Sequence, residues 1–225
     1  MNPRTAIINT LLSHITLTTG RPTARLAYLE IGVFGVARNY AHVAAGNKLA
    51  CDPAIDTRAA DGVLPWESAR LWRLLAATRA TFDVIFVDGD HRYQTVHDDA
   101  AQAIRHLSDG GWLVMHDCLP ENASQASDDR EGNGPWCGGA YRVWQELLAA
   151  YPGAPAICVA ADHGVGIMRR PAIMPIDLPA LPAETIREPW TMDEIELTDR
   201  WRICATVDGA TKWLAGLAAK QWRTK

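Results

Sequence analysis

The sequence of 225 residues contains no run of 18 or more apolar residues, so no membrane-spanning helix is expected. Its first twenty residues are amphipathic, and they lack the compact apolar stretch and small-residue cleavage site of a signal peptide. A net charge of −4 at pH 7 is also far from the strongly basic balance of a protein that binds nucleic acid over a broad surface. These absences predict a protein with no nucleic-acid and no membrane partner.

Cysteines at metal-binding spacing are missing as well. The number of cysteines is odd, and no two of them form a CxxC pair. This pattern excludes a disulfide framework and a zinc cluster, and it is typical of free thiols in a reducing cytoplasm. The five cysteines are Cys51, Cys118, Cys137, Cys158 and Cys204.

Short apolar runs alternate with segments of helical periodicity along most of the chain. Hydrophobic residues make up 48% of the sequence, which is ample for a buried core. Such alternation predicts an α/β fold with a mainly parallel sheet. The runs at 156–161 and 165–170 predict an antiparallel hairpin at the end of that sheet. The other predicted strands cover 26–32, 47–52, 82–88 and 112–117, and the predicted helices cover 3–15, 36–45, 66–77, 94–107 and 139–151.

Three segments follow from this pattern. Residues 1–25 form an N-terminal helical segment, residues 26–170 the main domain, and residues 171–225 a proline-rich linker followed by one or two helices. Residues 53–65 and 118–138 have no periodicity and are predicted loops. A loop as long as 118–138 inside a compact domain is typical of a lid over a functional site.

Ligands of an open parallel sheet bind at the carboxyl ends of its strands. Four predicted strands of this chain end near an acid, and acids are unusual in buried strands. One such acid is often a helix cap, but four in succession favour a functional site. These strand-end residues are Glu30, Asp52, Asp88 and the pair His116–Asp117.

The first strand ends in LEIGVFG, which lacks the GxGxxG spacing of a dinucleotide-binding loop. Glycines after a strand still let the backbone approach a ligand closely. Asp52 follows 22 residues after Glu30, where a carboxylate can accept both hydroxyls of a ribose, whether of NAD or of S-adenosylmethionine. The alternative is a turn residue before Pro53. The candidate cofactor-binding residues are Glu30, Gly32, Phe34, Gly35, Asp52 and Asp88.

The next two strand ends predict a metal site. FDVIFVDGDHRY places Asp88 and His91 directly after a strand, and WLVMHDC places His116 and Asp117 after the next one. If these strands are neighbours, Asp88, His116 and Asp117 converge on a site suited to Mg or Mn. Such a site binds a substrate hydroxyl and lowers its pKa, and His91 then takes the proton as general base. The alternative is that both histidines cap helices or fill polar gaps.

Several of these motifs resemble the class I S-adenosylmethionine-dependent methyltransferases, and most closely the branch with metal-dependent sugar O-methyltransferases. The motifs are YLEIGVFG, LACDP, the stretch from FDVIFVDGDHRY to WLVMHDCLP, and HGVGIMRR. The resemblance implies a Rossmann-like, doubly wound sheet of seven strands with a terminal antiparallel hairpin. It also implies cofactor contacts at Glu30, Gly32 and Asp52, metal ligation at Asp88, His116 and Asp117, and a base at His91.

The implied activity is methyl transfer to a hydroxyl of a sugar or glycoside, which a small molecule or an oligosaccharide would supply. Trp136 and Trp144 are candidates for stacking on a sugar ring, with core packing as the alternative. A nicotinamide-dependent oxidoreductase and a non-catalytic cofactor-binding module are the other functions considered. A homodimer or higher homo-oligomer is expected, with the C-terminal extension as a dimer arm, a substrate wall or a satellite core. The tryptophans that would form that surface are Trp190, Trp201, Trp213 and Trp222.

Overall fold

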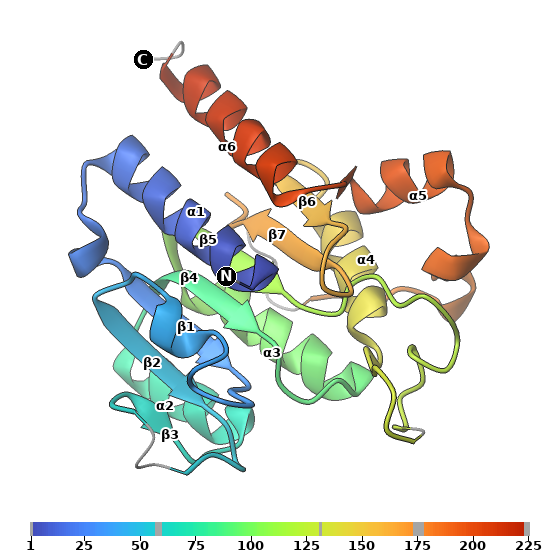
Figure 1. Cartoon of the computed structure of the whole chain (residues 1–225), viewed down its shortest axis with the longest axis horizontal. Coiled ribbons are helices and arrows are strands. Elements are labelled where there is room, and N and C mark those ends of the chain that lie inside the picture. The colour runs from blue at the N-terminus through green and yellow to red at the C-terminus, as the bar shows by residue number, and fades with distance from the viewer. Residues whose placement is uncertain (1, 57–59, 131, 173–177, 223–225) are drawn as a thin grey trace.

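A computed structural model of the chain describes residues 2–56, 60–130, 132–172 and 178–222. Parts of the predicted loop 53–65, of the loop 118–138 and of the C-terminal extension lie outside these residues, as does the side chain of Trp222. The described residues form a three-layer α/β structure, with helices on both faces of one sheet (Figure 1). No helix among them is long and apolar enough to cross a membrane.

The described strands form a sheet of eight, in the order β3-β2-β1-β4-β5-β7-β6-β8. Only β7 runs against the others, because it pairs antiparallel with both β5 and β6. The strands are β1 (Ala27–Ile31), β2 (Asn47–Cys51), β3 (Val63–Leu64), β4 (Phe82–Val87), β5 (Leu107–Met115), β6 (Ala156–Val159), β7 (Val165–Arg169) and β8 (Ile203–Cys204). The helices are α1 (Pro3–Thr19), α2 (Ser68–Thr78), α3 (Tyr93–His106), α4 (Ala140–Ala150), α5 (Glu194–Trp201) and α6 (Val207–Trp222).

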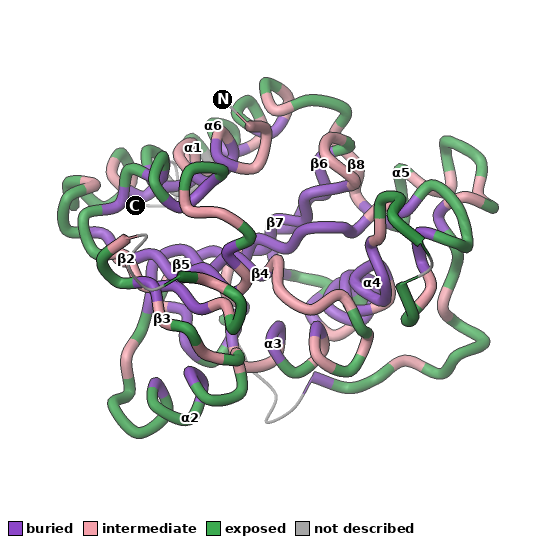
Figure 2. The backbone as a smooth tube through the Cα atoms, turned by 60° about the horizontal axis from the view of Figure 1, so that its bottom comes forward, coloured by how far each residue is buried: buried purple, intermediate pink, exposed green. Residues whose placement is uncertain are grey.

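Two hydrophobic cores lie on opposite faces of the sheet. Because side chains alternate along a strand, Ile85 of β4 joins the core under α2, α3 and α4, whereas Phe86 joins the core under α1 and α6. The central strands are therefore buried on both faces and read as continuous apolar runs (Figure 2). This burial on both faces explains why these strands can be predicted from the sequence.

Helix α1 covers the second face from a position before the first strand. Asn2 caps its first turn by accepting from the N–H of Arg4, and Pro3 stands at a position where no donor is needed. Gly20 ends the helix at φ 75°. Five apolar side chains of α1 are buried against the sheet and α6, namely Ile7, Ile8, Leu11, Leu12 and Ile15.

The helix predicted over residues 36–45 is wrong. This described segment contains turns and a short 3-10 helix, Tyr40–His42. Asn39 is buried, and its side chain donates to Tyr28 Oη and Glu30 Oε2 and accepts from Thr5 Oγ1. A helix upstream of β1 already packs on this face, so the connection between β1 and β2 is held by side-chain hydrogen bonds instead.

Two short strands escape the sequence prediction. β3 lies inside the predicted loop 53–65, and β8 lies inside the C-terminal extension, where it pairs with β6. Among the described residues the sheet therefore has eight strands where seven are expected, and β8 lies outside the hairpin β6–β7. A strand of only two residues has too little periodicity to be recognised in the sequence. β5 also begins at Leu107, ahead of the strand predicted over 112–117.

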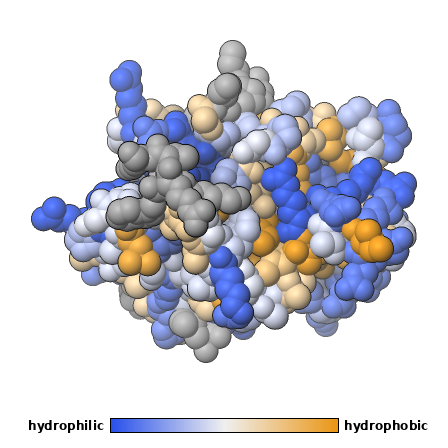
Figure 3. Space-filling model, turned by 90° about the horizontal axis from the view of Figure 1, so that it is seen from above, coloured by the Kyte–Doolittle hydropathy of each residue, from blue (hydrophilic) through white to orange (hydrophobic). Residues whose placement is uncertain are grey.

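The surface carries few large apolar side chains. Among the described residues these are Leu17, Phe34, Leu74 and Ile195. The face seen in Figure 3 intersperses hydrophobic with hydrophilic groups. Single exposed apolar residues are normal in a monomer, so the expected homo-oligomer stays a prediction.

Candidate active site

The carboxyl ends of β1, β2, β4 and β5 open into one cavity of about 1270 Å³. This edge of the sheet is where the sequence places its acids. The neighbouring strands β4 and β5 end in register, with Val87 opposite Met115, so the residues that follow them meet. Predicted site residues that line the cavity are Gly32, Phe34, Asp52, Asp88, His91, His116 and Asp117.

Gly32 lets two strand ends touch. Its φ is +85°, and a Cβ on it would lie 2.1 Å from the backbone oxygen of Asp88. No other residue fits there without moving β4, so the glycine fixes where Asp88 stands. Beyond it, Phe34 is 84% exposed at the cavity mouth, with the Arg38 guanidinium 4.4 Å from its ring centroid.

Asp52 is held by two backbone donors. Val33 N–H donates to Oδ2 at 2.9 Å, and Ala54 N–H donates to Oδ1 at 2.8 Å. The carboxylate is thereby fixed at the cavity wall. Each of its oxygens retains a further lone pair for a hydroxyl group.

Glu30 lies behind the cavity wall and not in it. It is buried, and its Oε2 accepts from Tyr28 Oη at 2.7 Å and from Asn39 Nδ2 at 3.0 Å. Burial raises the pKa of Glu30 to about 7 although both donors oppose the shift. Gly35 likewise does not line the cavity. In this geometry Glu30 supports the loop after β1 from within the core.

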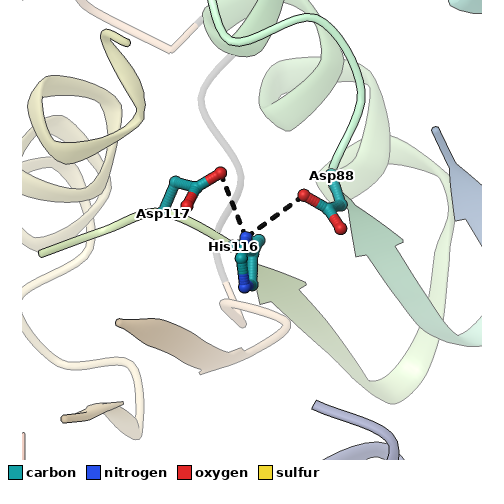
Figure 4. Close-up of side chains that lie close together, drawn as sticks. All are labelled: Asp88, His116 and Asp117. Atoms are coloured by element: carbon teal, nitrogen blue, oxygen red, sulfur yellow. Dashed lines mark ion pairs between the residues drawn. The ribbon is translucent and has the colours of Figure 1, made fainter. Parts of the chain in front are cut away.

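Asp88, His116 and Asp117 form a compact cluster (Figure 4). His116 Nδ1 lies 3.2 Å from Asp88 Oδ1 and 3.0 Å from Asp117 Oδ2. Asp117 adopts a left-handed conformation with φ 60°, a strained backbone that is common at functional sites. The adjacent strand ends thus bring together the three side chains that the sequence predicts to converge.

His116 is almost completely buried, yet neither ring nitrogen has a partner in hydrogen-bond geometry within the described chain. Burial would lower its pKa, but the surrounding carboxylates raise the pKa of His116 well above its ordinary value. Buried polar atoms without a complete hydrogen bond are rare in native structures and require an explanation, and a catalytic role or a bound ion is one.

The cluster fits a divalent cation. One donor atom from each of Asp88, His116 and Asp117 lies within 4.8 Å of the others. Two carboxylates and one imidazole are ligands that Mn²⁺ and, through the carboxylates, Mg²⁺ accept.

His91 stands beside this cluster and under Trp136. Its Nδ1 lies 2.6 Å from the Trp136 backbone oxygen and 3.1 Å from Asp117 Oδ2. Both neighbours are acceptors, so the hydrogen-bond network assigns the ring proton to Nδ1 and leaves Nε2 free to accept one. The rings of His91 and Trp136 stack at 5.0 Å with an interplanar angle of 12°.

The loop 118–138 reaches His91 through glycine. A Cβ on Gly138 would lie 2.0 Å from the backbone oxygen of His91, and Gly138 has φ +57°. The next residue, Gly139, donates its N–H to the same oxygen at 2.8 Å. This close approach places Trp136 over the imidazole. Trp144, the other candidate for sugar stacking, is fully buried in the core, so the alternative of core packing holds for it.

Two charged residues of the site escaped the sequence analysis. Arg4 of α1 pairs with Asp88, and its Nε donates to Asp162 Oδ2 at 2.8 Å. Asp162, in the turn between β6 and β7, also lies 3.3 Å from His116 Nε2. His116 and Arg4 lower the pKa of Asp162 to about 2. Neither residue closes a predicted strand of the parallel sheet, the position that marks the other site residues. His163, the next residue in the turn, lines the cavity as well.

A family model described as a methyltransferase domain matches residues 37–118. The matched segment runs from the approach to β2 to just past the end of β5. It therefore includes the strand-end residues Asp52, Asp88 and His116, but neither α1 nor the β6–β7 turn.

Several solved structures share the fold. An O-methyltransferase from Bacillus cereus, in complex with S-adenosylhomocysteine, is 20% identical with a TM-score of 0.50, over 75% of this chain and 80% of that one. The O-methyltransferase TomG from Streptomyces achromogenes, involved in tomaymycin synthesis and in complex with S-adenosylmethionine, is 16% identical with a TM-score of 0.51, over 76% and 82%.

The methyltransferase MycE of the mycinamycin biosynthetic pathway, in complex with Mg and S-adenosylhomocysteine, is 16% identical with a TM-score of 0.51. That match covers 73% of this chain and 50% of MycE, so the chain spans half of that relative. No curated protein matches the chain by sequence. Together, these likenesses show an α/β Rossmann-like methyltransferase fold.

Proposed function

We propose that this protein is an S-adenosylmethionine-dependent O-methyltransferase that acts on a hydroxyl of a sugar or glycoside. The observation that carries the proposal is one cavity, in a chain with a methyltransferase fold, that has a fixed carboxylate on one wall and an imidazole–carboxylate cluster on another. Fold alone does not determine chemistry, so the argument depends on these side chains.

Asp52 serves the cofactor side of the cavity. Its carboxylate, held by Val33 and Ala54, accepts the hydroxyl groups of the cofactor ribose. Gly32 lines the cavity and lets the two strand ends that frame it touch, and Phe34 lies at the entrance. When bound, S-adenosylmethionine supplies an electrophilic methyl group on its sulfonium.

Asp88, His116 and Asp117 are the residues that would hold Mg²⁺ or Mn²⁺ in this chain. Such an ion supplies Lewis acidity, which lowers the pKa of a coordinated hydroxyl group. The positioning falls to the chain itself, because Gly32 and the left-handed Asp117 hold two of the carboxylates in place.

His91 takes the proton of the acceptor hydroxyl on Nε2. This nitrogen lies on the side of the ring away from the Trp136 carbonyl and 4.0 Å from Asp88 Oδ1. The acceptor oxygen would bond to the methyl carbon as the methyl–sulfur bond breaks and S-adenosylhomocysteine leaves. The hydroxyl proton would pass to His91, which would end as an imidazolium beside two carboxylates. Those carboxylates, Asp88 and Asp117, stabilise that charge.

Trp136 provides the acceptor platform. It lines the cavity, stacks on His91, and is fixed by a hydrogen bond from its Nε1 to the Ser127 backbone oxygen at 2.6 Å. Aromatic faces pack against the apolar faces of sugar rings, and the part of the indole that His91 does not cover is the surface available for that contact. The loop 118–138 would thereby set the acceptor in line for transfer.

Calorimetric titration with S-adenosylmethionine tests the cofactor assignment. We expect binding by the wild type and its loss in Asp52→Ala, with Asp199→Ala on the exposed side of α5 as the matched control. If NAD binds in place of S-adenosylmethionine, the chain is an oxidoreductase.

Transfer of a labelled methyl group to a panel of sugars and glycosides, with and without Mg²⁺, tests the reaction. We expect label in an ether that is stable to mild base. Cofactor binding without transfer to any acceptor in the panel would favour a binding module, and indifference to metal would remove the ion from the proposal.

A further inference from the structure

Arg4 is the feature of the cavity that the proposed reaction leaves unexplained. It belongs to the first turn of α1, and the buried side chains of this helix otherwise pack on the sheet. Its side chain is 21% exposed and lines the cavity. Nε donates to Asp162 Oδ2, and Nη1 pairs with Asp88 Oδ2.

The two carboxylates that Arg4 bridges lie on opposite sides of His116. Asp88 presents its other oxygen, Oδ1, to His116 Nδ1, and Asp162 lies 3.3 Å from His116 Nε2. Arg4 therefore takes Oδ2 of Asp88, while Oδ1 is the atom turned toward Asp117 and His116. One side chain of α1 thus neutralises a carboxylate that the proposed metal site needs.

The β6–β7 turn is built to hold Asp162 there. Asp162, His163 and Gly164 all have positive φ, at 52°, 59° and 88°. Consecutive left-handed residues are strained unless the surroundings fix them. Here Cys118 and Leu119 donate their N–H groups to the backbone oxygens of Gly164 and His163. The turn is thereby tied to the segment that carries Asp117.

The positive charge of Arg4 determines its effect on a divalent cation bound at this cluster. A guanidinium keeps its charge at all relevant pH values, and it repels a divalent cation that shares a carboxylate with it. A unit charge a few ångströms from such an ion weakens binding on the order of tenfold even at a high effective dielectric constant.

We propose that Arg4 is a resident counter-cation that limits divalent-metal affinity at Asp88, His116 and Asp117. The inference rests on the metal part of the proposed function. It assigns to α1 a direct role in setting the ion concentration at which the site fills, and Asp162 is the second anchor that keeps Arg4 in place.

Titration of Mn²⁺, followed by the paramagnetic resonance of the free ion at fixed ionic strength, tests this without any turnover. We expect Arg4→Gln to bind Mn²⁺ about tenfold more tightly than the wild type. Arg4→Lys keeps the charge and should stay within about twofold of the wild type. Arg21→Gln is the matched control, because Arg21 pairs with Asp83 at the opposite end of β4, and it should leave Mn²⁺ binding unchanged.

Asp162→Asn gives a change of the opposite sign. This variant removes one negative charge and leaves Arg4 on Asp88 alone, so Mn²⁺ binding should weaken severalfold. If Arg4→Gln does not fold, Arg4→Met takes its place, because it also removes the charge and keeps an unbranched side chain. Equal or weaker Mn²⁺ binding by whichever of these variants folds overturns the inference.

S-adenosylmethionine binding is measured on the same samples as a separate readout. Its absence in the wild type would count against the proposed function, and the order of the Mn²⁺ affinities would still decide the role of Arg4.

Discussion

Strand β4 has an aspartate–arginine pair at each end, and the two pairs are built differently. At the amino end, Asp83 accepts from Arg21 Nη1 at 2.7 Å and Nη2 at 2.8 Å, from Ala27 N–H at 2.8 Å and from Ser108 Oγ at 2.9 Å. Burial would raise the pKa of Asp83, but these donors lower it. Every lone pair in the plane of this carboxylate is used.

At the carboxyl end, Asp88 pairs with Arg4 through one oxygen and turns the other toward His116 and His91. Neither His116 nitrogen completes a hydrogen bond within the described chain. The same two residue types thus make a closed structural pair at one end and an open site at the other. Satisfaction of hydrogen bonds, and not residue identity, separates scaffold from site.

Asp88→Asn should have the largest effect of the four substitutions, and it should act on the rate. The amide removes a negative charge from the open pair and points a donor at His116, so we expect methyl transfer to fall about 10³-fold, as for a group that stabilises developing charge. Initial-rate measurement of kcat/KM checks this. Unfolding by urea should change little, and a rate within tenfold of the wild type would remove Asp88 from the chemistry.

His91→Ala should lower kcat by about 10² to 10⁴, the range for loss of a positioned base. S-adenosylmethionine affinity should stay the same, because His91 lies on the acceptor side of the cavity. Added imidazole should restore part of the rate in the variant and none in the wild type. Failure of that rescue, or an unchanged kcat, would show that another group takes the proton.

Asp83→Asn should act on stability instead of activity. It leaves the Arg21 guanidinium without its carboxylate, and we expect a loss of about 2–3 kcal/mol in the free energy of unfolding. Because the pKa of Asp83 is lowered in the folded state, its contribution is present above pH 4 to 5 and disappears as the pH falls further. Urea unfolding at pH 7 and at pH 3 should therefore show a smaller difference at pH 3, and an equal difference at both would contradict it.

Glu30→Gln should give the smallest effect and the opposite sign. The folded-state pKa of Glu30 is raised to about 7, so the wild type pays an ionisation cost that grows between about pH 4.5 and 7 and persists above. At pH 8 the glutamine variant should be more stable than the wild type by about 2 kcal/mol, and at pH 5 the two should nearly coincide. Urea unfolding at both values decides it, and a destabilised variant at pH 8 would mean that the ionised carboxylate is needed.

The sequence predicts the central part of the molecule well because burial on two faces leaves a strong signal. β1, β4 and the end of β5 are mainly apolar runs, and the polar residues that follow β4 and β5 stand out. The convergence of Asp88, His116 and Asp117 needs only that β4 and β5 be neighbours, which short connections favour.

What the sequence does not predict depends on contacts between distant segments. Arg4 enters the cavity only because α1 packs across the sheet, and nothing near Arg4 in the chain shows this. Glu30 sits at a strand end like Asp52, but its side chain falls on the face that α1 covers and is sequestered by Asn39. The two-residue strand β8 exists because β6 offers it a free edge.

The Arg4 bridge has a consequence for the order in which the molecule assembles. Its partners lie 84 and 158 residues further along the chain, among the longest-range hydrogen bonds that the described residues make. Closing such long loops costs conformational entropy, and this cost is offset only when most contacts of the sheet have formed. We therefore expect the bridge to form late in folding, after β4 and the β6–β7 turn are in place. The cavity would then be complete only in fully folded molecules, and partly folded ones would be inactive.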